Sequence, residues 1–344
     1  MVGSTRYGRI KSVARRAIGA LSPTLWRLRR VPSLVVLAYH RVLPVGHPAR
    51  EYEQPGMWVS PESFERHLAI VAEYFEVVDL GDWLGRVQRG ETVPARACAI
   101  TFDDGWRDNF QYAYPLLCRA NVPATIFLVS DRIGGDYSFW PNRLARLLRT
   151  GNGLPIQHFP APIRDKLAAA RGSMWSRGEG ATVDQIDAAI NECKALPDSS
   201  IQEMLDAAEA QLAPEVRPFD RELLSESEIV EMSKSGLIRF GSHTRRHVRL
   251  LLDVAESDLQ DEIRNSQSHL ESLLREPIHL FCYPNGDVTE RAVALVSQTY
   301  SGAVTTVAGW NSAATDRFRL RRISIHEGIA SNRLSFLGRL GAFV

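Results

Sequence analysis

The chain has 344 residues, of which 44% are hydrophobic and 24% are charged, and its formal net charge is +1. This length is enough for one large domain or two ordinary ones, and the composition is that of a globular protein, which excludes a disordered or fibrous chain. Eight of the 41 basic residues and none of the 40 acids lie within residues 1–30, so the rest of the chain carries an excess of acids. No nucleic-acid partner is expected, because binding to phosphates needs a basic face.

Residues 1–30 form a basic N-terminal arm. Its apolar residues recur at steps of three and four, which favours an amphipathic helix: Ile10, Val13, Ala14, Ile18 and Leu21. Such a helix can lie on an anionic membrane surface, and the alternative is an arm that packs on the body or is disordered. No apolar run has the length of a spanning helix or the form of a secretion signal. We therefore expect a cytoplasmic protein, with peripheral association at the inner face of the cytoplasmic membrane as an open option.

The four cysteines stand far apart and form no CxxC pair: Cys98, Cys118, Cys193 and Cys282. This pattern favours buried free thiols over disulfides or a thiolate metal site, and it fits a reducing compartment.

From residue 31 to residue 137, short apolar segments alternate with helical ones. An apolar strand at 34–39 ends at His40, a loop follows at 43–56, and Ser60-Pro61 has the chemistry of a helix start. The other predicted elements here are strands at 75–80, 97–100 and 124–129 and helices at 80–87 and 108–120. This alternation predicts a parallel sheet or a barrel.

The pattern changes between residues 138 and 220, where strands are absent and helical spacing recurs at 163–171, 183–196 and 200–212. We interpret this region as a helical insertion. Alternation returns after Ser225, which forms a capping box with Glu228. The elements predicted there are strands at 237–240, 278–282, 303–307 and 320–325 and helices at 254–275 and 290–299.

Two adjacent carboxylates, Asp103 and Asp104, follow the buried strand at 97–100, and Gly105 comes next. Neighbouring side chains on an extended backbone point in different directions, so the two acids can serve different partners at one site. Paired carboxylates at the carboxyl end of a buried strand are where α/β barrels place their chemistry. A turn that only caps the next helix is the alternative.

A second polar motif, with His243 and His247, closes the strand at 237–240. On a helical turn, histidines at i and i+4 share one face and can hold one ion. A two-histidine site needs a carboxylate, and the best-placed one is in the Asp103-Asp104 pair. Two histidines and one carboxylate leave open coordination positions, as in a catalytic metal site.

Three motifs in this order resemble those of the polysaccharide deacetylase family, with its NodB homology domain: Thr-Phe-Asp-Asp-Gly at 101–105, His-Thr-Arg-Arg-His at 243–247 and Phe-Cys-Tyr-Pro-Asn-Gly at 281–286. The opening Leu-Ala-Tyr-His-Arg-Val at 37–42 is similar to bacterial members associated with exopolysaccharide formation. The resemblance covers residues 31–137 and 221–330. It implies an α/β fold, a distorted (β/α) barrel over residues 31–330. The helical insertion at 138–220 interrupts this barrel, and a C-terminal segment at 331–344 follows it.

The resemblance also implies a divalent metal, with Zn²⁺ as the expected ion. Residue by residue, Asp104, His243 and His247 match the family's metal ligands, and Asp103 matches its general base. Asp103 then takes the proton of a metal-activated water as that water attacks the amide carbonyl, an effect typically worth about 10²–10⁴ in rate.

The family's remaining catalytic groups match less well. The backbone N–H of Asn285 matches the donor to the oxyanion, and His326 matches the histidine acid that protonates the departing amine. Family members often carry aspartates before a tryptophan, and the stretch that ends at Trp310 has no acid. A surface histidine at a strand end is therefore the alternative for His326.

The family often places an arginine beside the base, and this chain has Cys282 at that position. Arg322 is the candidate replacement, and an exposed arginine in a basic run is the alternative. The candidate substrate-binding residues are Tyr283, Trp310, His40 and Arg322. A structural role is the alternative for His40 and Trp310.

We therefore predict a metal-dependent carbohydrate deacetylase, a hydrolase of carbon–nitrogen bonds that acts on an N-acetylated glycan or glycan precursor. Two other classes stay open, because substrate choice lies in loops and the later motifs are altered. One is a hydrolase with the same chemistry on another amide or an O-acetyl ester, and the other is a catalytically weakened glycan-binding protein. The sequence does not specify an oligomeric state.

Overall fold

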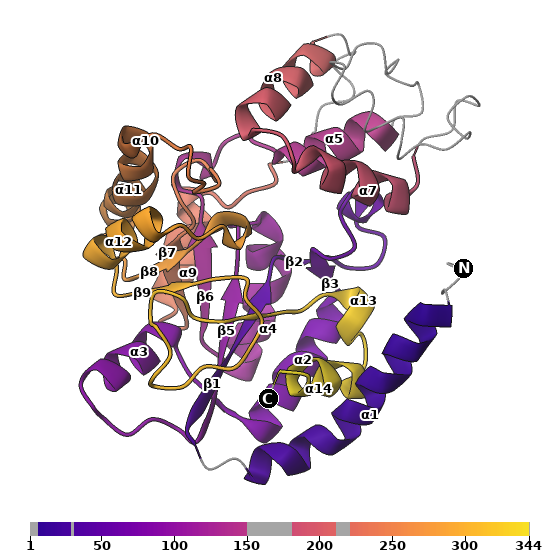
Figure 1. Cartoon of the computed structure of the whole chain (residues 1–344), viewed down its shortest axis with the longest axis vertical. Helices are drawn as coiled ribbons and strands as arrows, with labels where there is room; N and C mark the ends of the chain where they lie inside the picture. The colour runs from indigo at the N-terminus through magenta and orange to yellow at the C-terminus, as the bar shows by residue number, and fades with distance from the viewer. Residues whose placement is uncertain (1–5, 29–30, 150–180, 211–220, 344) are drawn as a thin grey trace. The chain divides into compact units, whose positions relative to one another are not determined.

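The computed structural model describes residues 6–28, 31–149, 181–210 and 221–343 (Figure 1). The chain divides into two compact units, the first comprising residues 1–43, 58–135 and 223–344 and the second 44–57 and 136–222. Both the N-terminal arm and the C-terminal segment belong to the first unit. The predicted helical segment at 163–171 and the end of the segment at 200–212 lie outside the described residues.

The first unit is built around an eight-stranded sheet with the strand order β10-β1-β5-β6-β7-β8-β9, and β4 also pairs with β5. All of these pairings are parallel. The strands are β1 (Ser33–Tyr39), β4 (Glu76–Val77), β5 (Arg96–Phe102), β6 (Ala124–Leu128), β7 (Ile238–Ser242), β8 (Leu280–Cys282), β9 (Gly302–Val304) and β10 (Ile323–Ser324). A separate parallel pair consists of β2 (Arg41–Val42) and β3 (Trp58–Val59).

The edges of this sheet approach each other through one segment. Val304 of β9 forms a parallel bridge with Leu320, and the chain then continues into β10, which pairs with β1. Every residue of β1 is buried, as expected for a parallel strand that is covered on both faces. Figure 1 shows the curled sheet with helices around it, which confirms the predicted distorted (β/α) barrel.

The helices of the first unit begin largely where the sequence predicts. Ser60 caps α2 through the N–H of Ser63, and the capping box of Ser225 and Glu228 starts α9. A π-turn at Asp261–Asn265 lies within the predicted helix at 254–275. The helices are α1 (Arg6–Leu28), α2 (Pro61–Tyr74), α3 (Leu80–Gln88), α4 (Tyr114–Ala120), α9 (Glu226–Lys234), α10 (Glu256–Gln260), α11 (Ser266–Leu274), α12 (Glu290–Thr299), α13 (Glu327–Ala330) and α14 (Arg333–Gly341).

The second unit has a hydrophobic core of its own. Its helices are α5 (Trp140–Arg149), α7 (Val183–Cys193) and α8 (Asp198–Glu209), and their apolar faces pack together. Residues 44–57 join this unit, where Asn142 donates a hydrogen bond of 2.9 Å to Glu53. The described part of the segment at 138–220 is therefore helical, as predicted.

All four cysteines are free and three of them are buried, which agrees with the expectation of free thiols. Among the described residues, no helix combines the length and the apolar character that crossing a bilayer requires.

Candidate active site

The two carboxylates leave β5 at a sharp turn. The N–H of Asp103 donates to the carbonyl of Tyr39 at 3.0 Å, which continues the β1–β5 pairing by one residue. Asp104 and Gly105 then adopt left-handed backbone angles, with φ values of +73° and +75°. A side chain at position 105 would lie 2.8 Å from Cδ2 of Leu128, so this turn requires glycine. The two carboxylates consequently face different neighbours.

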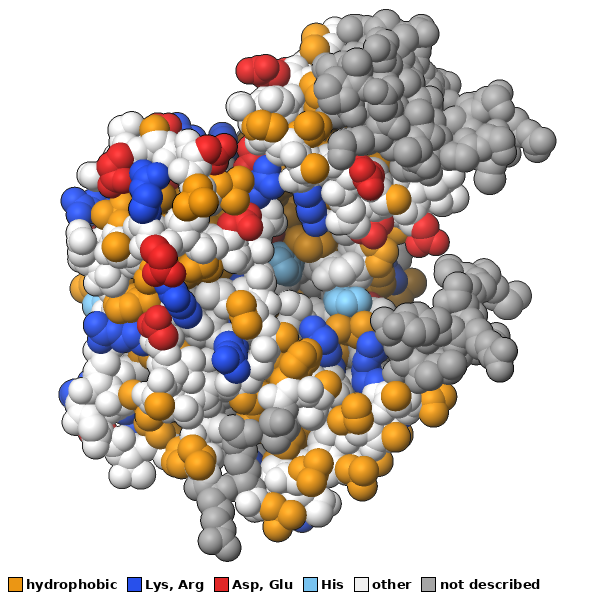
Figure 2. Space-filling view, viewed as in Figure 1, with side chains coloured by type: hydrophobic (Ala, Val, Ile, Leu, Met, Phe, Trp, Pro, Cys, Tyr) orange, Lys and Arg blue, Asp and Glu red, His pale blue; other side chains and the backbone are white. Residues whose placement is uncertain are grey.

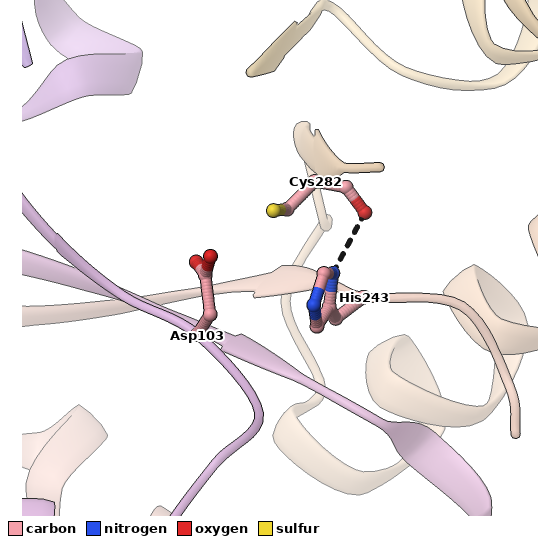
Figure 3. A group of neighbouring side chains, drawn as sticks. All are labelled: Asp103, His243 and Cys282. Atoms are coloured by element: carbon pink, nitrogen blue, oxygen red, sulfur yellow. Dashed lines mark hydrogen bonds between the residues drawn. The ribbon is translucent and has the colours of Figure 1, made fainter. Parts of the chain in front are cut away.

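Asp104 lies between two histidines. Its Oδ1 is 3.4 Å from Nε2 of His243 and 3.4 Å from Nε2 of His247. Its Oδ2 accepts a hydrogen bond of 2.9 Å from the indole N–H of Trp106. Nδ1 of His243 is 2.8 Å from the carbonyl oxygen of Cys282 (Figure 3). Because a carbonyl only accepts, Nδ1 carries a proton and Nε2 is the atom that His243 can offer to an ion.

The loop that carries these histidines is not helical, so the prediction of a helical turn is wrong. Thr244 and His247 have φ values of +66° and +65°, and the N–H of His247 donates to Oγ1 of Thr244 at 3.0 Å. The rings of His243 and His247 nevertheless have centroids only 4.9 Å apart. The i, i+4 spacing is compatible with a helix, and here two left-handed residues bring the rings together instead.

Glu262, a residue that the sequence analysis missed, holds this loop. It is fully buried in the π-turn between α10 and α11, and its Oε2 accepts from the N–H groups of Arg245 at 3.0 Å and Arg246 at 2.8 Å. Its Oε1 pairs with the Arg246 guanidinium at 2.6 Å. The signal that could have revealed it is a lone acid on the apolar face of the predicted helix at 254–275.

Asp103 faces a cation instead of histidines. Arg322 binds it in a bidentate pair, with Nη1 2.7 Å from Oδ1 and Nη2 2.8 Å from Oδ2. The same guanidinium is 3.2 Å from Oγ1 of Thr101, 2.9 Å from the carbonyl of Thr305 and 3.2 Å from Sγ of Cys282. Arg322 is only 1% exposed. It therefore lies beside the carboxylate as the candidate replacement should, and its prediction as a substrate-binding side chain is wrong because it is buried.

Both carboxylates are ionised at neutral pH despite their burial. Burial alone would raise the pKa of Asp103, but the charge and hydrogen bonds of Arg322 lower it below its usual range. Burial would likewise raise the pKa of Asp104, but its contacts with His243 and His247 hold that pKa well below the usual range. Because Arg322 already neutralises Asp103, the carboxylate that favours a bound cation is Asp104.

A second buried network supports Asp104 through Trp106. The Arg41 guanidinium lies 4.0 Å from the centre of the Trp106 ring and pairs with Asp108 at 2.8 Å. Asp108 also accepts from the N–H of Val42 at 2.7 Å. Sequence reasoning did not single out these residues, although Trp106 and Asp108 follow the Asp-Asp-Gly turn directly.

His40 lies at the end of β1, next to the predicted base. Its Nε2 is 3.9 Å from Oδ2 of Asp103, and its side chain is 25% exposed. The N–H group of the Asn109 side chain donates to the His40 carbonyl at 2.8 Å, which fixes the backbone there. His40 thus remains a candidate for contact with a substrate.

Asn285 lies on the exposed turn after β8, with a φ of +55°. Its carbonyl accepts from Oγ1 of Thr306 at 3.4 Å. A side chain at Gly286 would overlap Thr306, so the close approach of these two loops depends on glycine. This turn follows Cys282, whose carbonyl holds His243.

His326 follows β10. Its Nδ1 is buried and has no hydrogen-bond partner in the part of the chain that the structure describes. Burial, together with the charges of Arg339 and Arg15, lowers the pKa of His326 to about 4, so its imidazole is neutral at neutral pH. No hydrogen bond or ion pair among the described residues joins Asn285 or His326 to the two carboxylates.

Two predicted substrate-binding side chains lie in the core instead. Tyr283 is buried, and its hydroxyl donates to the carbonyl of Phe318 at 3.1 Å. Trp310 packs against Trp26, with ring centroids 5.7 Å apart, and its N–H donates to the carbonyl of Leu340 at 3.0 Å. The predictions for Tyr283 and Trp310 are therefore wrong, because aromatic residues beside a motif fill a core as readily as they line a groove.

Comparisons with known proteins show to which family and fold the chain is similar. A family model described as polysaccharide deacetylase matches residues 90–156 and 200–301. YxkH of Bacillus subtilis, which is named for the same activity, is 37% identical over 59 residues, and this match spans about a fifth (21%) of that protein and 17% of this chain.

Solved structures show the same fold. The Streptococcus pyogenes deacetylase PplD, in complex with acetate, has a TM-score of 0.58 and 17% identity over 90% of this chain and 99% of its own. IcaB from Ammonifex degensii has a TM-score of 0.56 and 17% identity over 90% and 97%. From the family model, the fold and the motifs together, we conclude that this chain belongs to the polysaccharide deacetylase family.

Proposed function

We propose that this protein is a metal-dependent hydrolase that removes N-acetyl groups from a glycan or glycan precursor. The observation that carries the proposal is the cluster of Asp104, His243 and His247 beside the ionised Asp103. One ligand atom from each of the three clustered residues lies within 4.8 Å of the others. Family membership supports deacetylation of glycans, and the site geometry supports the metal and the roles below.

The three clustered residues fit a divalent ion, with Zn²⁺ as the expected one. Carboxylate oxygen and imidazole nitrogen are common zinc ligands, and three protein ligands leave an open position for chemistry. Trp106 and the carbonyl of Cys282 already orient Asp104 and His243 from outside, as outer partners of metal ligands do. When bound, such an ion supplies Lewis acidity and lowers the pKa of a coordinated water.

A second group of possible ligands, Asp103, His243 and Cys282, is a poorer metal site. Arg322 already contacts both oxygens of Asp103 and the sulfur of Cys282. A cation placed there would meet the positive charge of Arg322 at close range. We therefore assign the ion to Asp104, His243 and His247.

Asp103 is the proposed general base. Arg322 uses one lone pair on each carboxylate oxygen, and each oxygen keeps another lone pair that can accept a proton from water. The bidentate contact also fixes the plane of the carboxylate, so the proton acceptor is oriented before substrate arrives. Proton transfer of this kind typically contributes about 10²–10⁴ in rate.

The remaining roles rest on the resemblance to the family. We propose that the backbone N–H of Asn285 donates a hydrogen bond to the carbonyl oxygen of the substrate, where negative charge develops. We propose that His326 protonates the departing amine. We propose that His40, which lies 3.9 Å from Asp103, contacts the substrate. The pKa of about 4 means that His326 must gain a proton during the reaction before it can deliver one.

The motif at 37–42 leads us to propose an exopolysaccharide or its precursor as the substrate. The free cysteines fit a reducing compartment, and we propose the cytoplasm as the place of action. Acetate release from a panel of N-acetylated glycans and their carriers tests the function. We expect release from at least one of them, and a fall of at least about a hundredfold in Asp103→Asn. Asp253→Asn, which changes an exposed acid, is the matched control and should behave as wild type.

Two results would contradict the proposal. Release from O-acetyl esters or other amides alone would assign the same chemistry to another substrate class. A purified protein that neither holds nor recruits a divalent ion would indicate a glycan-binding role without catalysis.

A further inference from the structure

The N-terminal helix α1 has one face that is fixed to the first unit. Gly19 lies against the backbone carbonyl of Leu334, and Gly338 lies against that of Arg15, so small residues allow α1 and α14 to approach closely. Ser22 and Trp26 on the same face are buried. The arm therefore packs on the body, which the sequence analysis gave as one alternative.

The opposite face of α1 presents apolar side chains to solvent. Val13, Leu21, Leu25 and Leu28 are each 51–72% exposed. At 3.6 residues per turn they fall within an arc of about 120° and extend over about 22 Å of the helix axis. Figure 2 shows hydrophobic side chains along the lower right edge of the view, where Figure 1 draws α1. We call these four residues the apolar stripe.

The charges carried by α1 itself have one sign, and the exposed Glu73 of α2, which is paired with Arg333, is an acid that interacts with Arg27. Arg16 and Arg27 are exposed, and their positions on the helix put them together along one border of the stripe. Residues 1–50 contain no acid at all. A second copy of the chain would bring like charges together at this surface, whereas anionic headgroups would neutralise them.

We propose that the apolar stripe docks the protein on an anionic lipid bilayer. Helix α1 lies in the plane of the interface, with the stripe inserted below the headgroups and Arg16 and Arg27 at the phosphates. Gly19, Gly338 and the buried Trp26 hold the helix to the barrel while its other face meets lipid. This inference does not depend on the proposed hydrolase activity.

Flotation of the full chain with lipid vesicles tests the docking. We expect recovery with phosphatidylcholine vesicles that contain about 30% phosphatidylglycerol and little recovery with phosphatidylcholine alone, because part of the attraction is electrostatic. Leu21→Glu/Leu25→Glu should weaken partitioning at least about tenfold, because it removes apolar burial in the interface. Arg16→Glu/Arg27→Glu should abolish the preference for anionic vesicles.

The matched control is Leu252→Glu, which changes an equally exposed leucine outside α1 and should float as wild type does. Equal recovery of wild type and Leu21→Glu/Leu25→Glu would overturn the proposal, and so would a wild type that floats with neither vesicle. A dimer that Leu21→Glu/Leu25→Glu dissociates, seen by light scattering without vesicle binding, would assign the stripe to a second copy. If a leucine variant has lost its circular dichroism spectrum, the arginine pair decides the outcome.

Discussion

Asp103 and Asp104 are consecutive residues with the same side chain, yet their surroundings differ in kind. Asp103 is paired with a permanent cation, Arg322, through two short hydrogen bonds. Asp104 is held by an indole and faces two imidazoles, whose ring nitrogens can share an ion with it. The left-handed backbone at Asp104 creates this separation. The two residues therefore take different proposed roles, Asp103 as base and Asp104 as metal ligand, because the backbone turns between them at the end of β5.

The largest expected effect is on the Asp104 side. Asp104→Asn keeps the shape of the side chain but removes the charge that binds a cation. We expect loss of the bound divalent ion and a fall in acetate release of at least about a thousandfold, because metal catalysis is worth several kcal/mol. Elemental analysis and an acetate assay measure the two effects. A variant that keeps both its ion and its activity would place the metal elsewhere.

Next in size is the Asp103 side, where removal of the cation leaves a buried carboxylate unpaired. Arg322→Met should lower the free energy of unfolding by about 3–5 kcal/mol and reduce turnover, while metal content stays at the wild-type level. Urea denaturation, the acetate assay and elemental analysis check these outcomes. Asp103→Asn/Arg322→Met, which removes both charges, is the matched control and should regain part of the lost stability.

The pH dependence of this loss has a defined sign. Because Arg322 lowers the pKa of Asp103 in the folded state, the pair stabilises the protein above the unfolded-state pKa of about 4 and loses that effect as the pH falls through the folded-state pKa. The difference in unfolding free energy between wild type and Arg322→Met should therefore shrink below about pH 4. A difference that is constant with pH, or unchanged turnover in Arg322→Met, would leave Arg322 without the role of supporting the base.

The sequence was sufficient to predict the surroundings of Asp104, but it only suggested those of Asp103. The order of the motifs predicts that Asp104 and the two histidines share a site, because each motif follows a strand of one parallel sheet. The bidentate contact between Asp103 and Arg322 joins residues 219 positions apart, so no local pattern encodes it. Arg322 was therefore only one hypothesis within a basic run.

Outer partners were the hardest to predict. Glu262 reaches the histidine loop from a helix, and its role depends on backbone N–H groups that any sequence presents. The left-handed angles at Thr244 and His247 likewise have no sequence signature, because neither residue is glycine. Periodicity locates elements, whereas these contacts depend on how loops from different strands meet.

A smaller effect is expected from Trp106, which orients Asp104 without touching an ion. Trp106→Phe removes the indole N–H that donates to Oδ2 and should weaken metal affinity by about 10–100-fold, as loss of such an outer partner typically does. Competition with a fluorescent chelator measures the affinity. The matched control is Trp83→Phe, because Nε1 of Trp83 is buried and has no partner among the described residues. Equal affinity in both variants would mean that the Trp106 hydrogen bond does not position Asp104.

The smallest effect is expected at Cys282, whose different atoms contact both sides of the comparison. Its sulfur lies 3.2 Å from the Arg322 guanidinium, while its backbone carbonyl accepts from His243. Burial raises the pKa of the Cys282 thiol, so the sulfur is neutral and leaves the charge of Arg322 to Asp103. Cys282→Ala removes only the sulfur and should lower stability by about 1 kcal/mol through the lost contact.

The carbonyl of residue 282 survives this substitution, so metal affinity should equal that of wild type even as stability falls. Urea denaturation and the chelator assay measure the two quantities on the same sample. If Cys282→Ala also lost metal affinity, the two sides of the site would be coupled through the strand end, and the separate surroundings of Asp103 and Asp104 would not act independently. Unchanged metal affinity would mean that Cys282 supports the metal ligand His243 through its backbone carbonyl alone. The side chain at position 282 could then vary without disturbing the metal ligands.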